Sequence, residues 1–237
     1  MKICAWSGPR NFATALMYAF GARADCAVSD EPFYAAYLKA TGLDHPMRDD
    51  VLARQSADPA EVVRSCAGPP PGGHPCWYQK HMAHHLPWGL PLDWAKGARH
   101  VFLIRHPARV VASYTQKRER PTLPDLGLER QIHLYERFGG VVLDSADIRT
   151  APEPSLRALC AALDLPFDPA MLNWPAGGHP SDGIWASHWY DAIHTTTGFA
   201  APEGPLPKLT GDLAALEDAA LPLYERLARH RLRLAEV

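Results

Sequence analysis

Residues 2–16, KICAWSGPRNFATAL, join a short apolar run, a loop with a lone arginine and the start of a helix-forming stretch. Residues 2–6 predict a buried strand, and residues 12–24 predict a helix with a stop signal at Gly21. A strand that feeds a tight turn into a helix directs several backbone N–H groups at one spot, where the helix dipole also favours negative charge. The stretch therefore predicts a loop that holds an anion.

The residue types in this loop narrow the choice of anion. Gly8 allows close backbone approach, Arg10 adds a forked cation suited to phosphate or sulfate oxygens, and Thr14 places a hydroxyl in the first helical turn. A Walker A loop needs GxxxxGK[ST], but Phe12 and Ala13 stand where that motif would close on Gly-Lys. This mismatch argues against an ATP-dependent kinase. On this stretch alone, an arginine that merely satisfies a helix end or a surface carboxylate remains an alternative.

Short apolar runs alternate with helical patterns along the rest of the chain. The predicted strands are residues 26–30, 76–81, 100–105 and 139–145. The predicted helices are 33–42, one beginning at Pro107, 128–138, 154–163, and 213–232 with a kink or break near Pro222. This alternation predicts an α/β fold with a mostly parallel sheet covered by helices on both faces, in which ligands bind beyond the carboxyl ends of the strands. The distinctive residues fall at those ends: 8–14, 30–31, 80–81 and 105.

Composition limits the class of protein. The 237 residues carry a net charge of −2, which gives no reason to expect nucleic-acid binding, and they fit one domain over residues 1–237. No stretch reaches about 18 consecutive apolar residues, so no membrane span is expected. The five cysteines are odd in number and lack a CxxC pair, which favours a reducing, cytoplasmic location. The basic run QKRER (116–120) is interpreted as a solvated helix end, with attraction of an anionic ligand as the alternative.

A second anion motif lies in HVFLIRHPARVVASY (100–114). Arg105 is expected at a strand end, and Ser113 follows eight residues later, about two turns into the next helix. A cation and a hydroxyl in this arrangement could hold a second phosphate, apart from the one in the first loop. A strand-end arginine in a salt bridge, with an incidental serine, remains the alternative.

With both motifs present, the sequence resembles the sulfotransferases that use 3′-phosphoadenosine-5′-phosphosulfate (PAPS). Pro9-Arg10-Asn11-Phe12-Ala13-Thr14 matches the frame of their 5′-phosphosulfate loop, and Arg105-His106-Pro107 with Ser113 matches their 3′-phosphate motif. The resemblance covers roughly residues 2–175 and includes DEPF (30–33), YQKH (78–81) and the late segment 141–168.

The sequence departs from this family at several positions. Phe12 and Ala13 replace the usual Gly and Thr, and Ala15 stands where a tryptophan often stacks on adenine. The late cofactor segment of cytosolic members is not recognisable, and Trp185, Trp189 and HTTTGF (194–199) lie where a replacement is expected. The identity of the adenine contact therefore stays open.

The resemblance implies a three-layer, P-loop NTPase-like sulfotransferase fold. It also implies transfer of a sulfuryl group from PAPS, without a metal, to a hydroxyl or amine of a small-molecule acceptor. The loops at 68–75 and 175–183 are expected to shape the acceptor pocket, but neither the acceptor nor the oligomeric state follows from the sequence. The implied cofactor-binding residues are Gly8, Pro9, Arg10, Asn11, Phe12, Ala13, Thr14, Arg105 and Ser113.

Four residues are candidates for catalysis. Arg10 is expected to neutralise charge on the leaving oxygen. Glu31 is the first choice for the base that takes the acceptor proton, although a capping role for Asp30-Glu31-Pro32 at the next helix remains open. His81 competes as the base, with a structural role equally open, and Lys80 is expected to assist the sulfate oxygens.

Three other functions remain as alternatives. A protein of this fold that binds nucleotide without transfer is suggested by Phe12, Ala13 and Ala15. A small-molecule kinase would need Mg-ATP. A metal-dependent hydrolase could use the histidine cluster, but HxxHH lacks the glutamate of HExxH, so no metal site is predicted. The histidines in question are His74, His81, His84 and His85.

Overall fold

The structure, a computed structural model, describes residues 1–116 and 121–234, so residues 117–120 of the basic run QKRER lie outside the described residues. The opening apolar run forms β1 (Lys2–Ser7), the central strand of a five-stranded parallel sheet with the order β2-β3-β1-β4-β5. Each predicted strand is present, with its ends shifted by at most two residues. The other strands are β2 (Cys26–Asp30), β3 (Cys76–Met82), β4 (Arg99–Ile104) and β5 (Val141–Asp144).

The predicted helices are also present, and further short ones join them. The predicted set comprises α1 (Ala13–Gly21), α2 (Tyr34–Thr41), α5 (Pro107–Tyr114), α6 (Leu128–Phe138), α8 (Pro152–Ala162) and α11 (Asp212–Ala228). The helices that were not predicted from the sequence are α3 (Arg48–Arg54), α4 (Pro59–Ala67), α7 (Ser145–Thr150), α9 (Ala186–Trp189) and α10 (Asp191–His194). Among the helices of the described residues, none combines the length and apolarity needed to cross a membrane.

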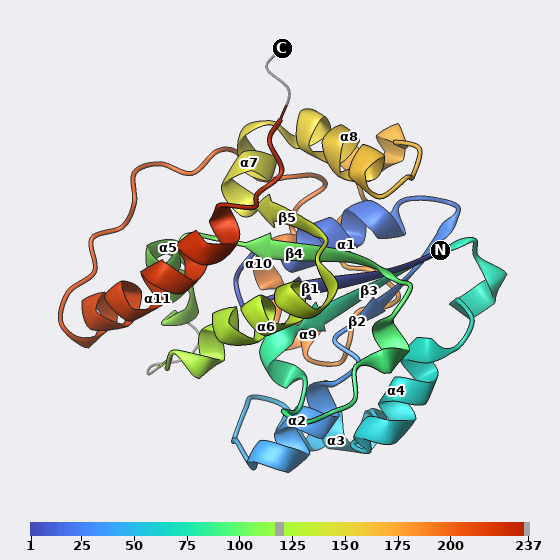
Figure 1. Cartoon of the computed structure of the whole chain (residues 1–237), viewed down its shortest axis with the longest axis horizontal. Coiled ribbons are helices and arrows are strands. Elements are labelled where there is room, and N and C mark those ends of the chain that lie inside the picture. Colours follow the sequence, from blue (N-terminus) through green and yellow to red (C-terminus); the bar gives the residue numbers. More distant parts are fainter. Residues whose placement is uncertain (117–120, 235–237) are drawn as a thin grey trace.

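Helices cover both faces of the sheet (Figure 1). Along β1 the side chains alternate: Ile3 and Ala5 face a cluster with α1 and α8, whereas Cys4 and Trp6 face a second cluster with α5, α6 and α11. Burial on both faces explains why the strands read as continuous apolar runs rather than as alternating ones. The prediction of a parallel sheet between two helical layers is therefore confirmed.

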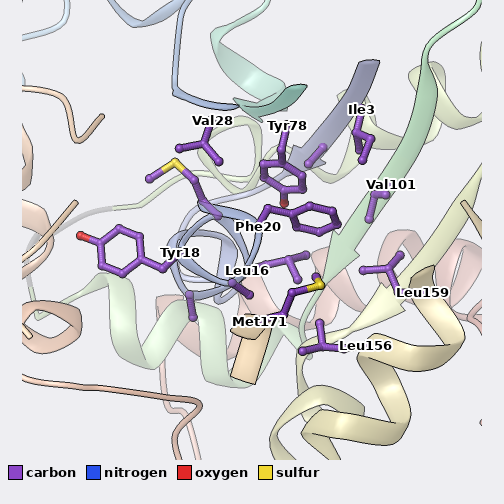
Figure 2. Close-up of a cluster of buried hydrophobic side chains, with 14 of the residues drawn as sticks. Ile3, Leu16, Tyr18, Phe20, Val28, Tyr78, Val101, Leu156, Leu159 and Met171 are labelled. Carbon is purple, nitrogen blue, oxygen red and sulfur yellow. The ribbon is translucent and has the colours of Figure 1, made fainter. Parts of the chain in front are cut away.

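Figure 2 shows the first cluster, in which α1 lies against the sheet. Phe20 of α1 stacks on Tyr78 of β3, with ring centroids 4.3 Å apart. Leu156 and Leu159 of α8 complete this cluster, on the same face of the sheet as α1. This packing fixes α1 relative to the sheet, and it therefore fixes the loop that joins β1 to α1.

The predicted kink or break at Pro222 does not end the last helix. α11 continues through Pro222 to Ala228. Ala220 and Leu227, on either side of the proline, are buried in the second cluster, where the helix packs against α5 and α6. This packing outweighs the loss of the one backbone hydrogen bond that proline removes.

A third cluster lies outside the two sheet faces. Tyr34 and Leu38 of α2 and Val51 of α3 pack against Trp185 and Tyr190 from the chain that follows residue 183. The cluster brings a late, irregular part of the chain back to the end of β2. It thereby carries Tyr190 to the carboxyl edge of the sheet.

Candidate active site

The loop between β1 and α1 has a strained backbone. Arg10 (φ 58°) and Phe12 (φ 72°) both adopt the left-handed region that residues other than glycine rarely occupy. Gly8 is required for a different reason: a Cβ there would lie 2.1 Å from the carbonyl oxygen of Leu126. The glycine thus allows close approach of another part of the protein. Strain of this kind is typical of functional loops.

Two residues of the loop use their side chains to fix it in place. The Asn11 amide donates to the carbonyl oxygen of Leu103 in β4 (3.1 Å), although Asn11 was predicted to bind cofactor. The Phe12 ring packs against Phe199, with centroids 5.9 Å apart. Phe12 is also the N-cap of α1, which begins without a side-chain cap. The backbone N–H groups of the first turn are therefore left without a side-chain acceptor.

The two predicted anion motifs meet in one place. Arg10 Nε donates to Ser113 Oγ (2.9 Å), and Arg105 Nη1 donates to the carbonyl oxygen of Arg10 (2.6 Å). Burial, and then the charge of Arg105, lower the pKa of Arg10. A cavity of about 340 Å³ is lined by all the predicted cofactor-binding residues: Gly8, Pro9, Arg10, Asn11, Phe12, Ala13, Thr14, Arg105 and Ser113.

Arg105 also makes the salt bridge that the sequence analysis kept as an alternative. Its Nη2 donates to Glu203 Oε1. Arg105 Nε is buried, and no residue of the described chain accepts a hydrogen bond from it. Arg105 lines the cavity, but its two Nη atoms are already bonded to Arg10 and Glu203.

A buried charge cluster forms the other half of the cavity. Lys80 Nζ lies 2.7 Å from Asp30 Oδ1 and 2.7 Å from Glu31 Oε1, and the three side chains are at most 10% exposed. The Tyr190 hydroxyl bonds to Lys80 and donates to Asp30 (2.9 Å to Oδ2). Burial and the two carboxylates raise the pKa of Tyr190 well above its usual value, so the phenol stays protonated and acts as a donor.

Glu31 lies at a sharp turn after β2. Its φ is 41°, and its carbonyl oxygen accepts hydrogen bonds from Gln55 Nε2 (2.9 Å) and from the Tyr34 amide (3.1 Å). The N-cap of α2 is Phe33, without a side-chain cap, so the proposed capping role of the Glu31 carboxylate is wrong. The carboxylate instead turns to Lys80. Burial raises the pKa of Glu31, against the lowering effect of Lys80.

Lys80 lines the cavity, but its ammonium is occupied. A lysine has three N–H donors, and those of Lys80 go to Asp30, Glu31 and Tyr190. Burial opposes the charge, yet the two carboxylates outweigh it and hold the pKa of Lys80 above its ordinary value. Lys80 thus holds the two carboxylates and Tyr190 in place, and its expected contact with sulfate oxygens stays a prediction.

His81 lies outside the cavity. β3 runs to Met82, so Lys80 and His81 are consecutive strand residues that point to opposite faces. The His81 ring stacks on Trp6 (centroids 4.6 Å apart), and its Nε2 lies 3.2 Å from Gln79 Oε1. Burial lowers the pKa of His81 to about 3, with a smaller effect from His100. The structure therefore does not bring this candidate base to the cavity.

Two other histidines of the cluster, His84 and His85, pack as aromatic rings. His85 stacks on Tyr34 and Tyr37 (centroids 4.5 and 4.6 Å apart), and His84 packs edge-on against His85. Burial holds the pKa of His85 well below its ordinary value, so its ring is neutral beside Glu31 Oε2 (3.7 Å). Within residues 1–116 and 121–234, no three His, Cys, Asp or Glu side chains are placed to hold a metal.

Trp185, Trp189 and residues 194–199 were expected to replace the missing cofactor motif, and only some of them reach the cavity. Trp189 lines the cavity, and its carbonyl oxygen accepts from Arg10 Nη1 (3.4 Å); Thr196 lines it as well. Trp185 is buried instead, edge-on against Tyr34. Sequence reasoning missed Tyr190 and Glu203, because no periodic pattern in the late segment predicts which strand end it reaches.

Comparisons with known proteins agree with the family that the sequence resembles. The sulfotransferase-domain family matches residues 1–231, so the chain belongs to the sulfotransferase-domain family. It is 36% identical to two Arabidopsis thaliana proteins called branched-chain-amino-acid aminotransferase-like protein 1 and protein 2. Each match covers 96% of this chain but only 42% and 41% of the relatives, so the chain spans about two fifths of their length.

A solved structure shares the fold. The sulfotransferase domain from the Synechococcus PCC 7002 olefin synthase matches with a TM-score of 0.50 and 17% identity, over 92% of this chain and 94% of that one. The predicted α/β sulfotransferase fold is thus confirmed.

Proposed function

We propose that this chain is a PAPS-dependent sulfotransferase that moves a sulfuryl group to a hydroxyl or amine of a small-molecule acceptor. The observation that carries the proposal is the meeting of Arg10, Arg105 and Ser113 in one cavity with Glu31. All five cysteines are free thiols, which supports a reducing compartment such as the cytoplasm.

The donor half of the cavity fits a molecule with two separated anionic groups. The uncapped start of α1 and Arg10 suit the 5′-phosphosulfate, because backbone N–H groups and a guanidinium converge there. Arg105, with its unused Nε, and Ser113 suit the 3′-phosphate. Trp189 and Thr196 of the late segment line the same cavity.

PAPS, when bound, supplies the activated sulfuryl group, and adenosine 3′,5′-bisphosphate is its leaving group. Arg10 neutralises the negative charge that develops on the leaving oxygen. Glu31 accepts the acceptor proton, and its raised pKa brings it closer to the working pH. Lys80 and Tyr190 hold the Glu31 carboxylate in one orientation, so both act as positioning residues.

Thermal unfolding with adenosine 3′,5′-bisphosphate, compared with Mg-ATP, tests the cofactor. Ligand at about 100 times its Kd stabilises the folded state by about 2.7 kcal/mol, or roughly 5–10 °C in Tm for a chain of this size. We expect this shift with the bisphosphate and its loss in Arg105→Ala. Arg157→Ala is the matched control, because Arg157 is exposed and pairs with Glu153.

The other outcomes separate the remaining functions. A shift with Mg-ATP alone would contradict the proposal and favour a kinase. A shift with the bisphosphate, but no transfer from PAPS to any member of a panel of alcohols, phenols and amines, would indicate a nucleotide-binding protein without transferase activity.

A further inference from the structure

Three arginines from different elements converge on one carboxylate. Arg105 follows β4, Arg109 lies in α5 and Arg149 lies in α7, and all three approach Glu203. Arg149 Nη1 lies 3.1 Å from Glu203 Oε1, Arg109 Nε lies 3.4 Å from Oε2, and Arg105 Nη2 donates to Oε1. The four side chains are between 10% and 19% exposed. This group carries a formal excess of two positive charges.

Residues 201–210, the segment that carries Glu203, make few other contacts with the rest of the chain. Residues 201–210 form no regular secondary structure, and none of them is buried. Figure 1 shows the stretch before α11 as an extended loop on the outside of the molecule. Its polar ties are to the same arginines: Arg149 Nε donates to the Ala201 carbonyl oxygen (2.8 Å), and Arg109 Nη2 donates to that of Gly204. A segment with few buried contacts opens at low cost.

We propose that Arg105, Arg109 and Arg149 form a binding site for a phosphate dianion, and that Glu203 closes this site until the phosphate displaces it. The inference rests on the proposed function to the extent that Arg105 holds the 3′-phosphate of the nucleotide. Arg109 and Arg149 are then phosphate ligands that no sequence motif indicated.

The charges and hydrogen bonds favour this exchange. A phosphate monoester carries close to two negative charges and three terminal oxygens, whereas a carboxylate carries one charge and two oxygens. Arg105 Nε and Glu203 Oε2 are both buried and lack a hydrogen-bond partner among the described residues. Burial opposes ionisation of Glu203, but the hydrogen bond from Arg105 and the charges of Arg149 and Arg109 hold its pKa below the usual range. Glu203 is thus an anion that only partly satisfies the three arginines.

Calorimetric titration of adenosine 3′,5′-bisphosphate, adenosine 5′-monophosphate and inorganic phosphate tests the proposal. We expect Glu203→Gln to tighten bisphosphate binding about tenfold, the scale of removing three partly exposed ion pairs, and to leave monophosphate binding unchanged. Arg149→Gln should weaken bisphosphate binding by a similar factor, and the exposed Arg157→Gln should not change it. Hydrogen exchange on the unmodified chain tests the proposal without any variant: the bisphosphate should increase exchange in residues 201–209.

Two results would overturn the inference while the proposed function stands. The first is bisphosphate binding that depends on Arg10 but is insensitive to Glu203→Gln and Arg149→Gln. The second is protection, rather than exposure, of residues 201–209 by the bisphosphate. If the bisphosphate binds no better than the monophosphate, the assignment of the 3′-phosphate fails instead. Tighter binding of inorganic phosphate in Glu203→Gln, reversed by adding Arg149→Gln, would still support the arginine site.

Discussion

The two halves of the cavity treat charge in opposite ways. At the ends of β1 and β4, Arg10 donates to the neutral oxygens of Ser113 and Trp189, and Arg105 donates to a backbone carbonyl as well as to Glu203. At the ends of β2 and β3, Lys80 closes on two carboxylates. The first half keeps positive charge available for an anionic ligand, whereas in the second half the lysine and the two carboxylates pair with one another. An open half, at the ends of β1 and β4, and a closed half, at the ends of β2 and β3, thus lie side by side at one sheet edge.

The strongest test of this contrast removes the cation of the closed half. In Lys80→Met, two buried carboxylates lose their partner, and breaking a buried ion pair in this way costs about 3–5 kcal/mol. We expect the free energy of unfolding, measured with urea at pH 7, to fall by that amount. The control Lys96→Met removes an exposed lysine that pairs with Asp93, and it should change stability by less than about 0.5 kcal/mol.

A double variant sharpens this test. Adding Glu31→Gln to Lys80→Met removes one of the two uncompensated charges, so part of the lost stability should return. A loss below about 1 kcal/mol in Lys80→Met, or no recovery in the double variant, would show that the cluster is not held together by the lysine.

Removal of the proposed base should affect catalysis more than binding. Glu31→Gln is expected to lower kcat by about 10²–10⁴, the usual contribution of a positioned base, with adenosine bisphosphate affinity unchanged. The measurement is transfer from PAPS to an acceptor found in the panel, with the exposed Glu61→Gln as the control.

The same role predicts a pH dependence. A base must be ionised, and burial raises the pKa of Glu31. In the unmodified chain, kcat/KM should therefore fall about tenfold per pH unit as the pH drops through a value above the ordinary glutamate pKa of about 4.3.

The pH profile also has a result that would count against Glu31. An acid limb that persists unchanged in Glu31→Gln would assign the titration to another group. His81 is a poor replacement, since its ring lies on the opposite face of β3 against Trp6.

The open half was easier to predict from the sequence than the closed half, for a physical reason. Its residues lie within a few positions of a strand end, so local patterns place them: the run before Ser7 predicts β1, and Pro107 marks the start of α5. Because parallel strands end at one edge, Arg10 and Arg105 were expected to meet there. No similar rule fixes the side to which a residue inside a strand points, and a shift of one position separates Lys80 from His81.

The partners that the late segment supplies to both halves could not be predicted in this way. Tyr190 contacts Lys80 across 110 residues, and Glu203 contacts Arg105 across 98 residues. Both come from the stretch between residues 173 and 211, which has only two four-residue helices and no hydrophobic period. Its path is set by tertiary packing, chiefly of Trp185 and Tyr190 on α2. Such contacts depend on the completed fold rather than on local sequence.

The smallest expected effect lies at the centre of the open half. Ser113→Ala removes a hydroxyl that accepts from Arg10 Nε (2.9 Å) and could also bond a phosphate. A single hydrogen bond contributes about 0.5–1.5 kcal/mol, so bisphosphate affinity should fall roughly 2–12-fold in a calorimetric titration. Stability should change little, because Arg10 retains its bond to Trp189. The exposed Ser56→Ala, which loses a bond to Glu61 and one from the Asp58 amide, is the control. A loss of stability as large as that in Lys80→Met would mean that the open half, too, is held together by its own polar contacts, and the contrast between the two halves would fail.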